Sequence, residues 1–119
     1  MKSALREIAL VAIALMVTGS AVAATTLENL QTAFNGESNA QARYLRFAGK
    51  AQDEGYLRVA SLFRAAARAE QIHVRNHAEV IRKMGGAPRA EVNAPEVRTT
   101  LENLQTAIEG EKYESDQMY

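Results

Sequence analysis

The sequence predicts an all-α fold, and three observations support this class. The interior is dense in Ala, Leu, Glu, Gln and Arg, which are good helix formers. Apolar residues recur with the period of a helix and lack the alternation typical of strands. The nine residues TTLENLQTA occur twice, at 25–33 and at 99–107, so one helical segment is expected to open in two places.

The first 23 residues are predicted to be a secretory signal peptide. Lys2 and Arg6 form a basic start, residues 8–17 are an unbroken apolar run, and residues 21–23 (AVA) match the small-residue pattern that signal peptidase cleaves. A membrane anchor is the alternative, but this run is shorter than the roughly 20 residues that span a bilayer. We therefore expect export to the periplasm of a Gram-negative host, with no membrane segment after cleavage.

The first helix of the mature chain, residues 24–119, is expected to begin with Thr25 or Thr26 as its N-cap. It is expected to end near Glu54, because Gly55 can adopt the left-handed conformation that terminates helices. This helix would form a helix pair with the next.

The second helix is predicted from about residue 57 to 84, where Gly85-Gly86-Ala87-Pro88 ends it. The segment 85–98 also contains Pro95 and is predicted to be a linker. The third helix opens at Thr99 and is still continuing at Tyr119.

Acidic residues fall on the predicted buried faces of all three helices. At 100° per residue the first stripe is Leu27, Leu30, Phe34, Glu37, Gln41, Tyr44 and Ala48. The second is Val59, Phe63, Ala66, Glu70, His73, His77, Ile81 and Met84. In the third helix the repeat places Leu101, Leu104, Ile108 and Glu111 where the first has Leu27, Leu30, Phe34 and Glu37. Carboxylates from three helices are thus predicted to share one interior.

An unpaired buried carboxylate costs at least several kcal/mol, so these groups must be protonated, ion-paired or bound to a cation. Arg43, Arg64 and Arg68 lie within helical reach as ion-pair partners. The repeat and the Glu70-x-x-His73 spacing favour metal, because helical bundles with such ligand sets bind paired iron or manganese. Two Fe²⁺ ions would balance four carboxylates in charge.

Composition narrows the possible functions. Fourteen basic and fourteen acidic residues give no net charge and therefore no electrostatic footprint for nucleic acid. The absence of cysteine excludes disulfides, thiolate metal sites and cysteine nucleophiles. Histidine and carboxylate are the remaining metal ligands.

The chain resembles the ferritin-like domain of rubrerythrins. The resemblance rests on the stretches AFNGES (33–38), RY (43–44), DEGY (53–56) and AEQIH (69–73), and in the third helix on IEGEKYE (108–114) and MY (118–119). It covers nearly the whole mature chain and implies a four-helix bundle, of which this chain carries two long helices and the start of a third.

The resemblance also implies a ligand set for two non-haem irons, with manganese or a mixed centre as alternatives. Glu37 would be a terminal ligand, Glu70 a bridging carboxylate and His73 an imidazole ligand, while Glu111 would bridge or cap and Glu114 would add a further carboxylate. Tyr44 and Tyr119 match tyrosines that hydrogen-bond these ligands. His77 does not match a ligand position, although it lies one turn beyond His73.

Two features depart from the family pattern. A fourth helix with a second Glu-x-x-His would fall at positions 144 and 147 by the 74-residue offset, past Tyr119. We expect either a longer protein or a homodimer that supplies Glu37, Glu70 and His73 twice. The rubredoxin module is also lacking, so electrons would come from an external donor protein.

The implied activity is reduction of hydrogen peroxide, or of dioxygen, in oxidative-stress defence. Two alternatives come from other classes of protein. One is a ferritin-like iron-binding module without peroxidase turnover, and the other is an inactive helical fragment that binds no iron.

Overall fold

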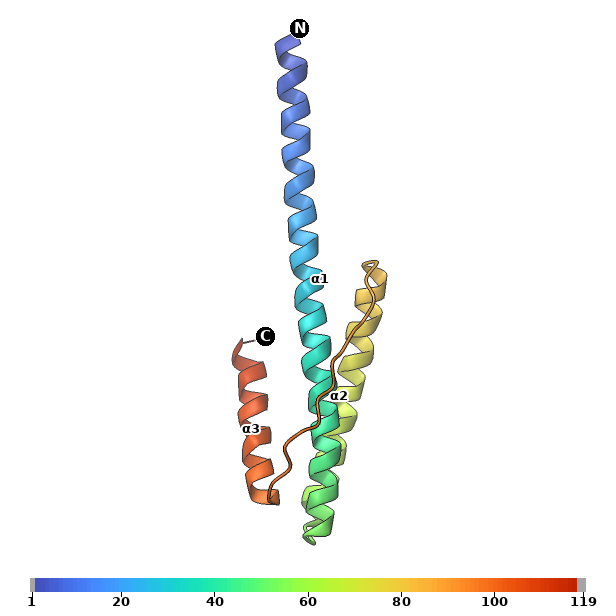
Figure 1. Cartoon of the computed structure of the whole chain (residues 1–119), viewed down its shortest axis with the longest axis vertical. Helices are drawn as coiled ribbons and strands as arrows, with labels where there is room; N and C mark the ends of the chain where they lie inside the picture. Colours follow the sequence, from blue (N-terminus) through green and yellow to red (C-terminus); the bar gives the residue numbers. More distant parts are fainter. Residues whose placement is uncertain (1, 118–119) are drawn as a thin grey trace.

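The computed structural model describes residues 2–117, and its side chains from residue 26 onward. Within these residues there are three helices and no strand: α1 (Lys2–Asp53), α2 (Leu57–Lys83) and α3 (Thr100–Gln117). The all-α prediction is confirmed. Helices α1 and α2 run antiparallel, the linker leaves the end of α2 and passes over α1, and α3 lies on the side of α1 away from α2 (Figure 1).

Helix α1 begins much earlier than predicted. It starts at Lys2 and passes through Thr25 and Thr26 without interruption, so the predicted N-cap at these threonines is wrong for the whole chain. The upstream residues are rich in Ala, Leu and Ile, and the isolated Gly19 costs only about 1 kcal/mol within a helix. The predicted cleavage after Ala23 concerns residues whose side chains lie outside the described part.

Two glycines close the first two helices, as the sequence predicts. Gly55 follows α1 with φ +83° and Gly85 follows α2 with φ +82°, in the left-handed region that favours glycine. The backbone N–H groups of Tyr56 and Gly86 donate to the carbonyls of Ala51 and Ile81, five residues back, at 2.8 and 2.9 Å. These hydrogen bonds form two Schellman motifs, which satisfy carbonyls at the helix ends.

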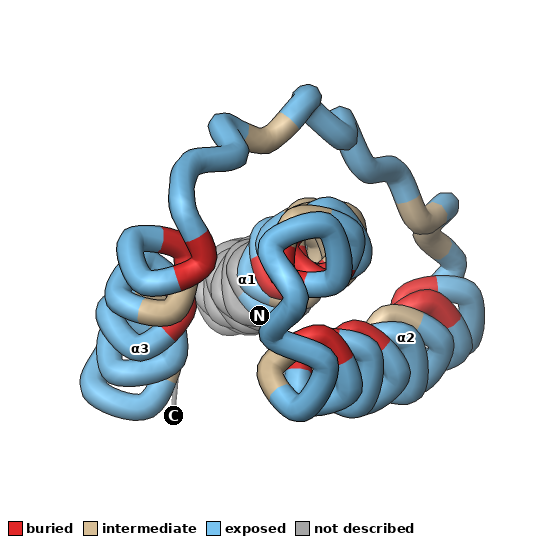
Figure 2. The backbone as a smooth tube through the Cα atoms, turned by 90° about the horizontal axis from the view of Figure 1, so that it is seen from below, coloured by how far each residue is buried: buried red, intermediate tan, exposed pale blue. Residues whose placement is uncertain are grey.

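The core lies between α1 and α2 and combines large aromatic rings with alanine. Phe63 of α2 packs edge-on against Phe47 (centroids 5.4 Å apart) and stacks near Tyr44 (6.1 Å). Small residues between the rings let the two helices approach closely: Ala40, Ala48, Ala51, Ala60 and Ala67. Figure 2 shows the buried positions of both helices facing each other. This packing holds the α1 and α2 residues of the candidate site.

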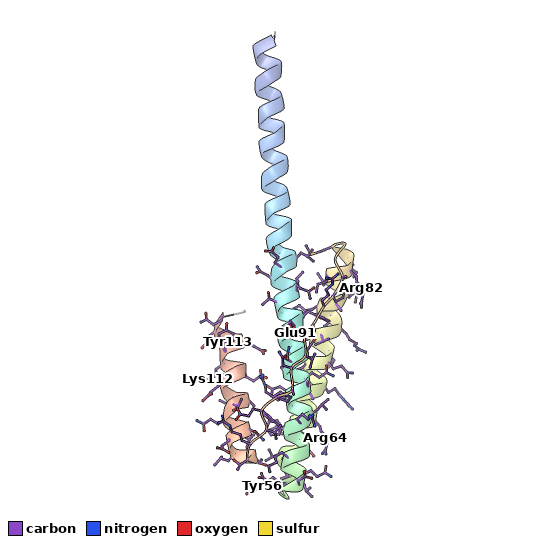
Figure 3. The ribbon with its side chains drawn as sticks, viewed as in Figure 1. Tyr56, Arg64, Arg82, Glu91, Lys112 and Tyr113 are labelled. Carbon is purple, nitrogen blue, oxygen red and sulfur yellow. The ribbon has the colours of Figure 1, made fainter. Side chains whose placement is uncertain are left out.

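Amide side chains of α1 hold the linker in place. Asn35 and Asn39 lie one turn apart and accept hydrogen bonds from the backbone N–H groups of Glu91 (2.8 Å) and Asn93 (3.0 Å). Asn39 also donates to the carbonyl of Glu91, and Gln31 donates to that of Arg89. Glu91 accordingly lies beside α1 in Figure 3. The linker thus gains the backbone hydrogen bonds that its lack of secondary structure would leave unmade.

The second copy of the repeat forms the N-terminus of α3. Thr99 and Glu102 make a capping box: Glu102 accepts from the Thr99 N–H at 3.1 Å and from its hydroxyl at 2.6 Å. Glu54, at the end of α1, accepts from the N–H of Thr100 at 2.8 Å. Buried Asn103 accepts from the N–H of Arg98 and donates to its carbonyl. Helix α3 is therefore fixed at its first turn.

Further along α3, the predicted buried stripe is wrong in part. Leu101 is 76 % exposed and Ile108 is 59 % exposed, whereas Thr100, Asn103 and Ala107 are buried. The reason is that α3 contacts α1 with a neighbouring face, and Leu104, Ile108 and Glu111 of the predicted face line an open groove between α2 and α3. Among the residues with described side chains, no helix has the length and apolarity needed to cross a bilayer.

Candidate metal centre

The first ligand group joins α1 and α2. Glu37 and Glu70 are among the most buried charged residues described, at 1 % and 4 % exposure. His73 Nδ1 lies 3.3 Å from Oε2 of Glu70 and 3.7 Å from Oε1 of Glu37. Each of the three residues offers a ligand atom within 4.8 Å of the others. The Glu-x-x-His spacing achieves this because residues three apart share one face of a helix.

The second ligand group adds α3 and shares one member with the first. Glu70, Glu111 and Glu114 also offer oxygens that all lie within 4.8 Å of one another. Glu70 is therefore common to both groups. Two cations bound in these groups would have this carboxylate between them.

Tyr44 links the core to the second group. Its hydroxyl donates a hydrogen bond to Oε1 of Glu111 at 2.5 Å. Burial and this hydrogen bond raise the pKa of the Tyr44 hydroxyl above its usual range, so the hydroxyl keeps its proton. Glu111 itself is exposed, contrary to the prediction of an inward stripe, and this bond holds its carboxylate toward the site.

Two carboxyl groups of the cluster, Glu70 and Glu114, have raised pKa values. Burial raises the pKa of Glu70 to about 7, and the nearby Glu114 adds to the effect. Burial, followed by the charges of Glu111 and Glu37, also raises the pKa of Glu114. Desolvation and like charge both disfavour the ionised form. A cation between these groups would relieve both effects.

Sequence reasoning assigned no role to His77, yet the structure places it against a predicted ligand. Its Nδ1 lies 2.8 Å from Oε2 of Glu37. Two of the arginines that were proposed as ion-pair partners for the buried carboxylates make other contacts. Arg64 is exposed and donates a hydrogen bond to Gln52. The guanidinium of Arg43 lies 5.8 Å from the centroid of the Tyr44 ring. The signal for His77 was its spacing, because it lies on the same face as His73 one turn later.

The centre opens onto an apolar groove of about 510 Å³ between α2 and α3. Leu62, Ala66, Leu104 and Ile108 line its walls, and Tyr44, Glu70, His73 and Glu111 also border it. The linker crosses α1 on the opposite side (Figure 2). His73, predicted to face inward, has a side chain 52 % exposed because it borders this opening.

The residues present suit a pair of hard or borderline cations. All five predicted ligands come together: Glu37, Glu70, His73, Glu111 and Glu114. Carboxylate oxygens and imidazole are ligands that iron and manganese accept, and Glu70 and Glu114 have raised pKa values, which a bound cation would lower. Their role as ligands stays a prediction. Tyr119, predicted to hydrogen-bond a ligand, lies outside the described residues.

Comparison with known proteins places this arrangement in a family. The rubrerythrin family model matches residues 28–119. The chain is 40 % identical over 96 residues to nigerythrin of Nitratidesulfovibrio vulgaris, an alignment that covers 80 % of this chain and 48 % of that protein. It is 36 % identical over 103 residues to rubrerythrin-2 of Clostridium acetobutylicum, covering 81 % and 53 % respectively.

A third similar protein is the rubrerythrin of Clostridium perfringens, which is 35 % identical over 98 residues, covering 79 % of this chain and 50 % of that protein. This chain thus spans about half the length of the relatives it matches. No solved structure matches it significantly. The resemblance inferred from the ligand motifs is confirmed.

Proposed function

Because this chain belongs to the rubrerythrin family, we propose that its carboxylate and histidine cluster binds two non-haem irons and reduces hydrogen peroxide. The family implies a di-iron ferritin-like domain with a role in oxidative stress. The observation that carries the proposal is the membership of Glu70 in both ligand groups. One carboxylate shared between two adjacent sets can hold a pair of neighbouring cations.

The proposed roles follow from the positions of the side chains. Glu37 and His73 would hold one iron, Glu111 and Glu114 the other, and Glu70 would lie between them. When bound in reduced form, two irons supply the two electrons that cleavage of one O–O bond consumes. Tyr44 keeps its proton and holds Glu111 in place. The proton held by Glu70 near neutral pH would be released on cation binding.

The partners and location are part of this proposal. We propose that electrons come from an external donor protein, as expected from the sequence. A homodimer, as the alternative to a longer protein, would supply Glu37, Glu70 and His73 twice. Export to the periplasm would follow from the predicted signal peptide.

The proposal is tested by loading the full chain with Fe²⁺ without oxygen and adding one equivalent of hydrogen peroxide. We expect rapid oxidation of two irons per peroxide, recorded by absorbance, and repeated turnover when a reductant is supplied. Glu70→Ala should abolish the reaction, whereas Glu79→Ala, an exposed change on the same helix, should leave it intact.

Two other results would contradict the peroxidase assignment and support the alternatives. A chain that binds and oxidises iron with oxygen, yet fails to turn over peroxide with a reductant, would be a ferritin-like iron-binding module. A chain that binds no iron would be a structural helical fragment.

A further inference from the structure

His77 makes a specific contact with the most deeply buried predicted ligand. Its Nδ1 lies 2.8 Å from Oε2 of Glu37 and 2.9 Å from the backbone carbonyl oxygen of His73. The side chain of His77 is 19 % exposed, compared with 52 % for His73. His77 is therefore packed into the protein, whereas His73 borders the groove.

The carbonyl contact determines which nitrogen carries the proton. A backbone carbonyl only accepts hydrogen bonds, so Nδ1 of His77 must be the N–H donor at 2.9 Å. A protonated nitrogen has no lone pair for a metal. In this arrangement Nδ1–H of His77 donates to the carbonyl, and Nδ1 also lies in close electrostatic contact with Oε2 of Glu37 without the alignment of a hydrogen bond. Nδ1 therefore does not serve as a ligand atom.

The contact with His77 also gives the two carboxylate oxygens of Glu37 different neighbours. Oε2 lies against His77, while Oε1 lies 3.7 Å from Nδ1 of His73, within the first ligand group. Because Glu37 is only 1 % exposed, little water reaches its carboxylate, and the protein determines its orientation. His77 thus occupies one oxygen and leaves the other directed to the centre.

We propose that His77 is a positioning residue that holds Oε2 of Glu37 and thereby presents Oε1 to the first metal position. This inference rests on the proposed metal binding of the centre. Groups that hydrogen-bond a ligand orient it and tune its basicity, and their loss typically lowers metal affinity by about 10- to 100-fold.

The test compares three variants of the full chain by titration of the metal-free protein with Co²⁺, followed by calorimetry and visible absorption. His77→Asn and His77→Leu form a matched pair, because the two side chains have the same branched shape and only Asn places an N–H donor near the position of Nδ1. Asn76→Ala is the control, since Asn76 is exposed on the same turn.

We expect His77→Leu to lose about 10- to 100-fold in affinity at one of two Co²⁺ positions and to keep the other within about threefold. His77→Asn should retain most of the affinity at both positions, and Asn76→Ala should match the parent. A loss confined to one position is not expected from general destabilisation, which would weaken both. Circular dichroism confirms that each variant is helical.

Three results would overturn the proposal. The first is Co²⁺ affinity in His77→Leu that is unchanged from the parent. The second is an equal loss of Co²⁺ affinity in His77→Asn and His77→Leu, which would mean that the imidazole itself is required. The third is failure of the parent to bind Co²⁺. If the parent binds two Co²⁺ but its iron-loaded form does not turn over peroxide, the peroxidase assignment fails and the comparison of variants still decides the role of His77.

Discussion

Replacing Glu70 by Gln should stabilise the metal-free protein at high pH. Glu70 has a folded-state pKa of about 7, above its ordinary value of 4.5. Between these values the folded chain holds a proton that the unfolded chain has released, so stability falls as pH rises from 4.5 through 7. The side chain of Gln carries no charge at any of these pH values and removes this loss.

The size of the effect follows from the interval between the two pKa values. At 1.36 kcal/mol for each pH unit, the difference between 4.5 and about 7 corresponds to at most roughly 3 kcal/mol. The side chain of Glu70 is only 5 % exposed, so water screens it little. Its contact with His73 at 3.3 Å favours the ionised form and is already included in this folded-state pKa. We therefore expect Glu70→Gln to gain up to about 3 kcal/mol over the parent at pH 8 and little at pH 4.

Urea unfolding of the full chain in a chelator, followed by circular dichroism at pH 4, 6 and 8, measures this difference. Glu79→Gln is the matched control, because Glu79 is exposed on α2 and pairs with Lys83 at 2.7 Å, which lowers its pKa. This control should gain nothing as pH rises. A Glu70→Gln variant that is no more stable than the parent at pH 8, or equally more stable at pH 4, would refute the reasoning.

Three further predictions test separate parts of the account. Tyr44→Phe removes the hydroxyl that donates to Glu111 and should lower the free energy of unfolding by about 1 kcal/mol, whereas Tyr56→Phe, at an exposed tyrosine, should leave it unchanged. Asn39→Ala removes the acceptor of the Asn93 N–H and should speed hydrogen exchange of that amide, with no change in Asn76→Ala. Expression of the full gene segment in a Gram-negative host should give a periplasmic protein whose N-terminal sequence begins at Ala24, and an uncleaved protein would contradict the signal-peptide prediction.

Helical periodicity was sufficient to predict the pairing of α1 and α2. Glycines 55 and 85 marked the helix ends, because their left-handed conformations are a local property of the chain. Glu70 and His73 could be placed together, and Glu37 on the buried stripe of its own helix, because helix geometry fixes which residues of one helix share a face. Those parts of the fold depend on local geometry alone.

Context decided the features that the sequence did not reveal. The same TTLENLQTA lies inside α1 in one copy and caps α3 in the other, because residues upstream of the first copy continue the helix and those upstream of the second do not. The hydrogen bonds of Asn35 and Asn39 with the linker connect segments that are more than fifty residues apart in the sequence. The contact of His77 with Glu37 likewise depends on how α1 and α2 pack.

The exposure of Leu101 and Ile108 likewise depends on how the helices pack. Periodicity identifies an apolar face, but the burial of that face depends on what packs against it. In the described residues Ile108 borders the groove beside the metal centre, and Leu101 lies outside the lining of that groove.

The central claim is that Glu70 serves two cation positions at once, and the number of Fe²⁺ ions bound per full chain without oxygen tests it most directly. The account predicts two ions for the parent, one for Glu114→Ala and none held tightly by Glu70→Ala. Retention of both ions by Glu70→Ala, or a parent chain that binds none, would contradict it.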